Sequence, residues 1–318
     1  MWGSAMGRYN FLLCVFVMTS SLGVAASPTE EQVIPFKLYS DYIVVVQGTI
    51  GNMTRRNLVI DTGAYPSVID RDLAKRLGLA GQKGTMRVLE QTLTAESVWL
   101  PEIEIGSVRS QNMRVVVRDL GAISQEFGVR VDAMIGLDVL ANRSFRIDYK
   151  RKTIVFGPVE TLSWSAPMRQ PAGMACVDVR IGGRLQRLLL DTGAGGFLLF
   201  ANRVPWVSRN AGYLRQSTNL GGTFTLRQIK ATEVMVGDQN LGSREILISD
   251  AQNMSVYPFD GLLAPAALGF REIAFDFEHG IFSWEAGNRH DDVHVATETP
   301  IVSNSRAVLS TVFPAPRD

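Results

Sequence analysis

Two aspartates in this sequence follow apolar runs and begin the same four-residue motif. Asp-Thr-Gly-Ala occurs at residues 61–64 and again at 191–194, each time directly after three large aliphatic residues. A short continuous apolar run is typical of a buried strand, and a glycine in the turn that follows lets another backbone come close. A carboxylate at such a point is costly unless it is hydrogen-bonded or shares its site with a partner. The pattern raises the hypothesis that Asp61 and Asp191 are each other's partner.

Two carboxylates that share one site can perform acid–base chemistry. Like charges so close cannot both ionise readily, so the pair holds one proton over a wide pH range. One group is then an acid and the other a base, and they can hold a water molecule between them. The base activates the water against a carbonyl carbon while the acid protonates the carbonyl oxygen. Asp61 and Asp191 are therefore candidates for amide hydrolysis without a metal or a covalent intermediate.

The residues after each aspartate suit this chemistry. The threonines can hydrogen-bond across to the opposite turn, and the glycines let backbone N–H groups reach the carboxylates. The alanines add no hydroxyl, so we expect a dyad that is less acid-stabilised than one with serine or threonine there. These supporting residues are Thr62, Gly63, Ala64, Thr192, Gly193 and Ala194.

The two motifs stand at matching points of a repeated pattern. Asp61 and Asp191 are offset by 130 residues, and three further pairs of identical residues are offset by 128. Those pairs are Asp132 and Asp260, Leu140 and Leu268, and Asp148 and Asp276. A nearly constant offset with matching chemistry indicates duplication of one β-rich unit, which can close about a pseudo-two-fold axis where equivalent turns meet. For Asp132 and Asp260 we favour a role as turn or cap residues.

Runs of β-branched and aliphatic residues between turn signals predict an all-β fold in both halves. One helix is expected at Asp70 to Leu77, because Asp70 can cap it and Gly78 stands where a helix ends. The second half has no clear helix at the matching place. Hairpin tips are expected near Glu90 to Thr94 and in the glycine-rich stretch Asn219 to Thr223.

Composition divides the chain into four parts. Residues 1–26 are the predicted signal peptide, residues 27–160 and 161–287 are the predicted lobes, and residues 288–318 are a polar tail. Ser27 to Phe36 has the character of a polar lead-in, and Pro158 to Pro171 that of a linker between the lobes.

Residues 1–26 have the features of a secretory signal peptide. Arg8 precedes the apolar run Phe11 to Met18, and Val24-Ala25-Ala26 fits the small-residue cleavage pattern. An uncleaved anchor is the alternative, but the run is shorter than the ~20 residues that a spanning helix needs. We expect a secreted or periplasmic protein with no stable membrane span after cleavage. Its one remaining cysteine, Cys176, is expected to be a small buried apolar residue.

The net charge and the absence of several known motifs argue against some classes of function. A net charge of +1 gives no electrostatic reason to expect a nucleic-acid partner. The sequence has no phosphate loop, no Gly-x-Ser-x-Gly and no Cys-x-x-Cys. His290 and His294 lie in the polar tail without a helical pattern to align them, which favours solvated side chains over metal ligands. We expect no metal and no cofactor.

These motifs together resemble the retropepsin-type aspartic peptidases. The resemblance rests on Asp-Thr-Gly-Ala in each half, a hairpin downstream and the segment Met134-Ile135-Gly136, and it covers most of residues 40 to 285. Two units fused in one chain, as in the bilobal pepsin arrangement, would each form a closed β-barrel-like lobe, with Asp61 and Asp191 as the catalytic pair. The second half departs from the first in having Ala264 in place of Gly136. The resemblance also implies flaps that contain Glu90, Gln91, Thr92, Gly221, Gly222 and Thr223.

The sequence thus predicts a bilobal, all-β aspartic endopeptidase that acts on peptides or proteins as a monomer. Three alternatives remain open. The chain could be a binding protein that retains the fold and holds an extended peptide without cleaving it. It could be a self-processing enzyme whose only substrate is itself or one partner. Each Asp-Thr-Gly could also be a purely structural turn.

Overall fold

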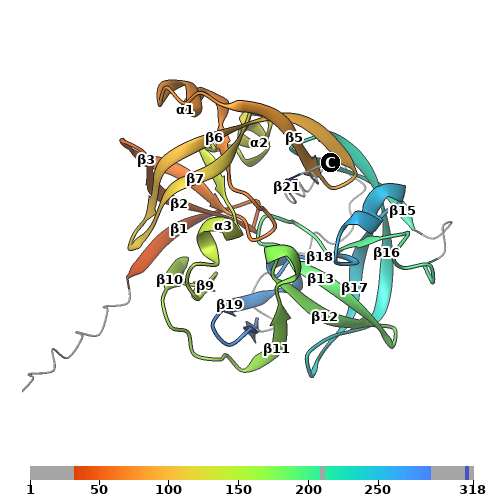
Figure 1. Ribbon diagram of the computed structural model, residues 1–318. Helices are drawn as coiled ribbons and strands as arrows, with labels where there is room; N and C mark the ends of the chain where they lie inside the picture. The colour runs from red at the N-terminus through yellow and green to blue at the C-terminus, as the bar shows by residue number, and fades with distance from the viewer. Residues whose placement is uncertain (1–31, 208–211, 288–311, 315–318) are drawn as a thin grey trace, which may run out of the picture. The chain divides into compact units, whose positions relative to one another are not determined.

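The computed structural model describes residues 32–207, 212–287 and 312–314, and in these ranges the chain is predominantly β-strand (Figure 1). This confirms the predicted all-β character. The predicted signal peptide and most of the predicted tail, including His290 and His294, lie outside the described residues. Across the described ranges, we find no helix whose length and apolar character would let it cross a membrane.

The first half builds ten strands and three short helices. The strands are β1 Val33–Tyr39, β2 Ile43–Ile50, β3 Met53–Ile60, β4 Val68–Asp70, β5 Gln82–Val88, β6 Gln91–Ile105, β7 Val108–Arg118, β8 Ala133–Ile135, β9 Phe145–Asp148 and β10 Thr153–Phe156. The helices are α1 Arg71–Arg76, α2 Gly121–Phe127 and α3 Leu137–Leu140.

Pairing in the first half places the strand that ends at Asp61 in the middle of its sheet. Strand β3 pairs antiparallel with β2 and parallel with β8, so that Ile60 lies opposite Ile135. Strand β4 then lies between β8 and β7 and runs parallel to β7. Strands β5, β6 and β7 form a meander, and β2 also contacts β6. Strand β3 and the three-residue strands β4 and β8 therefore each lie between two neighbouring strands.

The second half builds strands in nearly the same order. They are β11 Trp164–Arg169, β12 Cys176–Ile181, β13 Arg184–Leu190, β14 Leu198–Phe200, β15 Tyr213–Asn219, β16 Gly222–Val236, β17 Gln239–Ser249, β18 Gly261–Leu263, β19 Phe270–Asp276 and β20 Ile281–Ala286. Three 3₁₀ segments accompany them: η1 Pro171–Gly173, η2 Gln252–Val256 and η3 Ala266–Leu268.

The pairings of the second half match those of the first. Strand β13 pairs antiparallel with β12 and parallel with β18, and β14 lies between β18 and a parallel β17. Strands β15, β16 and β17 form the corresponding meander, with β12 against β16. Each half therefore holds one aspartate strand between an antiparallel and a parallel neighbour.

One further sheet contains strands from both halves, in the order β1, β10, β9, β19, β20, β11. At its centre Arg146 lies opposite Ala274, Phe145 opposite Phe275 and Ile147 opposite Ile273. A shift of 128 residues maps the pair Arg146 and Ala274 onto itself and converts the other two pairs into each other. The ladder therefore has the register of two strands related by a local two-fold axis. The rings of Phe145 and Phe275 stack across it at 4.7 Å.

The predicted helix at Asp70 to Leu77 is confirmed as α1, with the Asp70 side chain accepting hydrogen bonds from the N–H groups of Asp72 and Leu73. At the matching place in the second half, residues 201–207 form turns. Helix α2 was not predicted, because its N-cap is Leu120, which makes no side-chain capping bond and so leaves no sequence signal.

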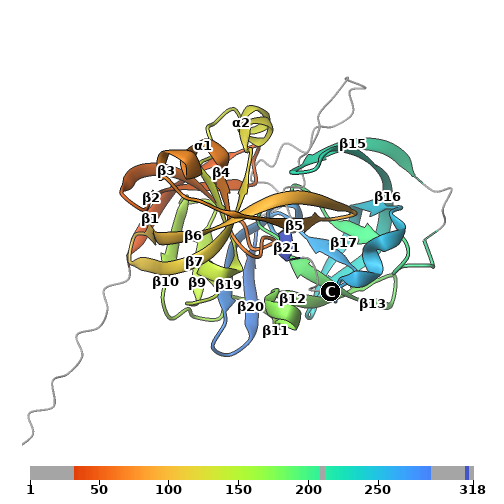
Figure 2. The same cartoon turned by 45° about the horizontal axis from the view of Figure 1, so that its top comes forward.

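Three stretches expected to be irregular contain strands. Strand β1 occupies part of the predicted lead-in, and β11 lies inside the predicted linker, where it pairs with β20 and β12. A short strand β21, Val312–Pro314, lies in the predicted tail and pairs with β5 (Figures 1 and 2). Each of these strands completes a sheet made by distant parts of the chain, so local composition alone did not indicate it.

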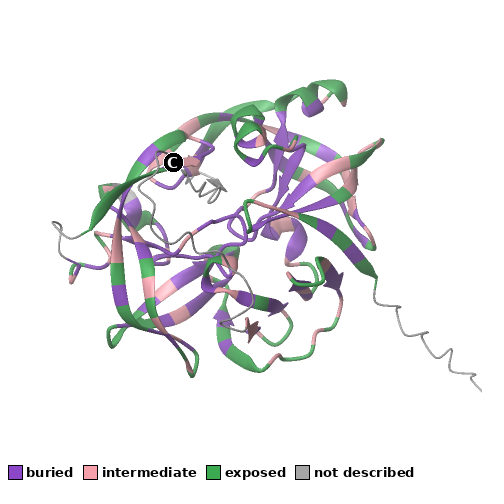
Figure 3. Ribbon diagram, turned by 180° about the vertical axis from the view of Figure 1, so that it is seen from behind, coloured by how far each residue is buried: buried purple, intermediate pink, exposed green. Residues whose placement is uncertain are grey.

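The core includes the strands that lead to both aspartates. The three residues before each aspartate are fully buried, whereas α1 is largely exposed (Figure 3). Cys176 is buried in this core, and burial raises the pKa of its thiol to about 12. This confirms the expectation of a small apolar residue, because a thiol that stays protonated is a poor nucleophile.

Candidate active site

Asp61 and Asp191 stand at the ends of β3 and β13, and matching backbone hydrogen bonds fix both. The N–H of Asp61 donates to the carbonyl of Ile135 at 3.0 Å, and the N–H of Asp191 donates to the carbonyl of Leu263 at 2.9 Å. Both acceptors end the parallel strand beside the aspartate strand. The same local fold therefore positions both carboxylates.

Thr62 and Thr192 connect the two turns through four hydrogen bonds. The Thr62 hydroxyl donates to the carbonyl of Leu190 at 2.8 Å and accepts from the N–H of Thr192 at 3.1 Å. In return, the Thr192 hydroxyl donates to the carbonyl of Ile60 at 2.8 Å and accepts from the N–H of Thr62 at 3.0 Å. All of these groups are buried, so the arrangement satisfies donors and acceptors that water does not reach. The structure thus places the threonines as the sequence predicts, with each reaching across to the opposite turn.

The two carboxylates lie against each other's turns. A Cβ atom added to Gly63 would stand 2.5 Å from the carboxylate carbon of Asp191, and one added to Gly193 would stand 2.6 Å from an Asp61 oxygen. The glycines are therefore required for the approach of the carboxylates. Each glycine N–H also donates to the aspartate of its own turn, at 3.0 Å for Asp61 and 2.9 Å for Asp191.

Burial raises the pKa of Asp61 well above its ordinary value, since its carboxyl group is fully enclosed. The negative charge of Asp191 and a hydrogen bond to its side chain raise this pKa further. The N–H groups of Gly63 and Ala64 oppose the shift. This electrostatic environment favours one shared proton on the pair, as the sequence analysis expected of two facing carboxylates.

Ser67 and Asp138 support the first turn and were not identified from the sequence. The N–H and hydroxyl of Ser67 donate to the Asp138 carboxylate at 2.9 and 2.6 Å, and the Ser67 hydroxyl accepts from the N–H of Gly136 at 2.9 Å. The carbonyl of Ala64 accepts from the N–H of Leu137 at 2.9 Å. Asp138 lies two residues after the segment Met134-Ile135-Gly136 on which the family resemblance rests, but Ser67 is 71 residues away and has no sequence signal of its own.

Asp132 and Asp260 have matching roles away from the dyad. Asp132 accepts from the N–H of Asn57 at 3.0 Å, and Asp260 accepts from the N–H of Arg187 at 2.9 Å. Both bonds act on the strands that lead to the two Asp-Thr-Gly-Ala turns. The two residues thus have structural contacts, but they bind a neighbouring strand, whereas we expected turn or cap residues.

The predicted flap residues lie at the ends of two hairpins with two-residue turns. The first turn is Leu89–Glu90 and the second is Leu220–Gly221, because Val88 pairs with Gln91 and Asn219 with Gly222. Of the residues singled out, Glu90 and Gly221 lie in these turns, whereas Gln91, Thr92, Gly222 and Thr223 lie at the start of the following strands. The first tip is therefore earlier in the chain than the expected Glu90 to Thr94. The tips contact each other, since a Cβ added to Gly221 would stand 2.3 Å from the Gln91 side-chain oxygen.

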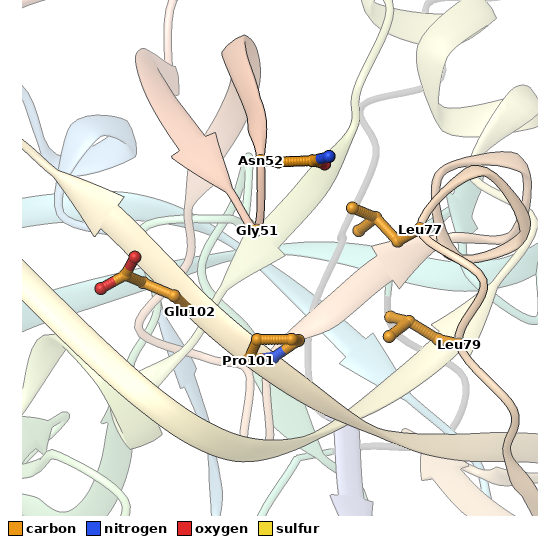
Figure 4. Close-up of a pocket in the computed structure, with 6 residues that line it drawn as sticks. All are labelled: Gly51, Asn52, Leu77, Leu79, Pro101 and Glu102. Carbon is orange, nitrogen blue, oxygen red and sulfur yellow. The ribbon is translucent and has the colours of Figure 1, made fainter.

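Two surface pockets lie away from the aspartates. One, of about 320 Å³, is lined by Gly51, Asn52, Leu77, Leu79, Pro101 and Glu102 (Figure 4). The other is lined by Asp72, Lys75, Arg76 and Arg130. Neither contains a dyad residue. Within the described ranges no three histidine, cysteine, aspartate or glutamate side chains gather in a way that could hold a metal ion.

Comparisons with known proteins agree with this site. Residues 46–139 match a family model described as aspartyl protease, and this range contains Asp61, the first hairpin and Asp138. Among solved structures, the chain is similar to a retropepsin-like aspartic protease from Rickettsia conorii, with 21% sequence identity and a TM-score of 0.30 over 40% of this chain and 90% of that one. No curated protein matches the chain. The family match supports, for the first half of the chain, the resemblance to aspartic peptidases that the motifs indicated.

Proposed function

We propose that this chain is an aspartic endopeptidase that hydrolyses peptide bonds with a water molecule activated between Asp61 and Asp191. One observation carries the proposal. Matching turns hold two buried aspartates close together. Burial and the nearby charge of Asp191 both raise the pKa of Asp61. A purely structural turn has no need of two carboxylates held together out of water, because that arrangement costs stability.

In the proposed reaction the pair starts with one proton. The ionised carboxylate takes a proton from water as the water oxygen bonds to the substrate carbonyl carbon, and the protonated carboxyl gives its proton to the carbonyl oxygen. When the tetrahedral species collapses, the carboxylate that gave up its proton takes a hydroxyl proton, and the other carboxyl gives the proton it took from water to the amide nitrogen as the C–N bond breaks. The pair again holds one proton at the end of the cycle.

We further propose that the two halves are tandem retropepsin-like lobes that arose by duplication, so that one chain supplies both aspartates and acts as a monomer. The matched strand pairings of the two halves and the four threonine hydrogen bonds support this arrangement. The features of residues 1–26 support export to the periplasm or the cell exterior.

Hydrolysis of a denatured protein over a pH series tests the proposal. Asp61→Asn and Asp191→Asn should each reduce cleavage by roughly 10³-fold or more with the fold intact, because either change removes half of the acid–base pair. Activity should fall as pH rises through the raised pKa of Asp61, since the pair then loses its shared proton. It should also fall in strong acid, when both groups are protonated. The variant Asp119→Asn, at an exposed aspartate, is the control.

Wild-type turnover in either dyad variant would contradict the assignment. An intact fold with no cleavage at any pH, and binding of extended peptides in its place, would favour a non-catalytic peptide-binding protein. Cleavage confined to the chain itself would identify a self-processing enzyme.

A further inference from the structure

The two hairpin tips are each bound by a side chain from the opposite half. The Tyr257 hydroxyl, from the second half, donates to the carbonyl of Leu89 at 2.7 Å. A guanidinium nitrogen of Arg118, from the first half, donates to the carbonyl of Leu220 at 3.3 Å. Leu89 and Leu220 are the first residues of the two turns, so they occupy matching positions, and both are buried. Equivalent carbonyl groups are thus held by donors that are not equivalent in sequence.

Tyr257 is held rigidly for this contact. Its ring stacks on Phe259 with centroids 5.2 Å apart and lies 5.8 Å from the ring of Phe200, and only 3% of the residue is exposed. Burial raises the pKa of its hydroxyl, so the group remains a hydrogen-bond donor. The aromatic packing therefore fixes the hydroxyl beside the first tip at no further cost in side-chain freedom.

Arg118 connects both hairpins at once. While one terminal nitrogen binds Leu220, the other donates to the carbonyl of Thr94, in the first hairpin, at 2.9 Å. A planar guanidinium can span two acceptors in this way, whereas a single ammonium group acts as a point donor. The contact of Gln91 with Gly221 is a further link between the two tips.

The joined tips lie over the strands that carry Asp61. Met86 and Val88 of the first hairpin and Leu220 of the second belong to one buried cluster with Val59 and Met134, which stand on β3 and β8. Figures 1 and 2 show the two hairpins extending from their own halves toward each other. If a peptide reaches the dyad between these hairpins, the tips have to separate to admit it.

We propose that Tyr257 and Arg118 are positioning residues that latch the two hairpins at their tips, so that both bonds break each time a peptide enters or leaves. This proposal rests on the proposed function. The bonds are present in the closed free protein, and closure over a bound peptide restores them. Loss of the bonds destabilises the closed free protein and the closed complex equally, relative to the open state. Peptide entry and release therefore become faster by the same factor, and the equilibrium affinity stays unchanged.

The decisive measurement is the association and dissociation rates of a peptide inhibitor with a hydroxyl group that mimics the transition state. Tyr257→Phe keeps the ring packing and removes the hydroxyl alone. Both rate constants should rise roughly fivefold, the effect of losing one neutral hydrogen bond, with Kd unchanged. Arg118→Lys should give a smaller rise of about twofold, because its bond to Leu220 is longer and a lysine cannot span both carbonyl groups. The control is Tyr149→Phe, which removes a buried hydroxyl in the sheet shared by the two halves.

A higher Kd with an unchanged association rate constant would mean that Tyr257 has only a structural role. Unchanged association and dissociation rate constants would show that Tyr257 does not latch the tips. Hydrogen exchange of the amides at residues 89–92 separates this question from catalysis. Exchange there should rise about fivefold in Tyr257→Phe and stay unchanged in Tyr149→Phe, whether or not the protein cleaves peptides. If the wild-type chain neither binds the inhibitor nor cleaves peptides but the exchange result holds, the proposed function fails and the latch remains. Equal exchange in wild type and Tyr257→Phe overturns the latch.

Discussion

The turns that carry Asp61 and Asp191 are alike at the aspartates and differ directly behind them. In the first half, Ser67 and Asp138 form a polar brace in which the serine binds both the carboxylate and the N–H of Gly136. The matching residues in the second half are Phe197 and Ala266. Phe197 is buried in the main core, so this turn is supported by apolar packing.

A second difference follows from the residues around Gly136. A Cβ on Gly136 would stand 2.3 Å from the carbonyl oxygen of Ala64, which approaches closely because it accepts from the N–H of Leu137. The second half has Ala264 and Pro265 at these positions. Proline has no N–H to donate, so the close approach that requires glycine is not needed there. Ala264, which departs from the family pattern, is therefore compatible with Pro265 beside it.

The features that both halves share are those that the pair of aspartates requires, whereas the features that differ serve only the fold. Both halves keep Asp-Thr-Gly-Ala, the parallel neighbouring strand and the threonine hydrogen bonds. The support behind each turn can be polar or apolar, provided that it fixes the backbone. Because different segments of one chain form the two halves, the residues that support each turn can differ.

The largest expected effect is at the apolar support. Phe197→Ala removes a fully buried ring and should lower the free energy of unfolding by ~4 kcal/mol, the usual cost of such a cavity. The loss should be nearly independent of pH, because no charged group is involved. Thermal or denaturant unfolding at several pH values measures it. A loss that grew with pH would mean that the second turn has a charged support after all.

Gly136→Ala and Ala264→Gly test the second difference. The added methyl at Gly136 meets backbone atoms, so it should destabilise the protein by about 3 kcal/mol and displace the first turn. Ala264→Gly should cost no more than about 1 kcal/mol, chiefly through backbone entropy. Equal costs in denaturant unfolding would show that the two positions are more alike than the hydrogen bonds indicate.

Ser67→Ala should cost about 2 kcal/mol at neutral pH and less in acid. Burial raises the pKa of Asp138 above its ordinary value of 3.8, and the hydrogen bonds from Ser67 hold the shift down. Ser67→Ala keeps the backbone N–H but removes the hydroxyl donor, so the pKa of Asp138 rises further. A carboxyl group with a raised pKa in the folded state contributes stability below its ordinary pKa and loses it as pH rises through the folded value, so the deficit of the variant should grow with pH over that range. Unfolding of the double variant Ser67→Ala/Asp138→Asn, which lacks the ionisable group, should remove this pH dependence.

Thr62→Val and Thr192→Val should lower the free energy of unfolding by nearly equal amounts, which is the smallest difference expected between the halves. Each removes one hydroxyl that donates to a carbonyl and accepts from an N–H, so each should cost about 2 kcal/mol, with Thr→Ser variants near wild type. Unfolding measurements that gave clearly unequal losses would show that the turns are held asymmetrically.

The sequence was most informative where signals are local. The two motifs and the helix after Asp70 depend on residues close together in the chain, and the structure contains them. Ser67, Arg118 and Tyr257 could not be found in this way, because their roles depend on partners 69 to 168 residues away. Strand β11 was missed for the same reason, since its neighbour β20 is far along the chain and its own six residues include a proline.

The threonine hydrogen bonds also determine when the site can exist. Thr62 binds Leu190, which lies 128 residues later, so the first turn leaves the ribosome well before its partner has been made. At roughly 5–20 residues per second, this interval is on the order of ten seconds. During synthesis the nascent chain holds a single carboxylate of the pair, and nearby nascent proteins are safe from it. The proposed peptidase becomes active only when the second half has folded onto the first.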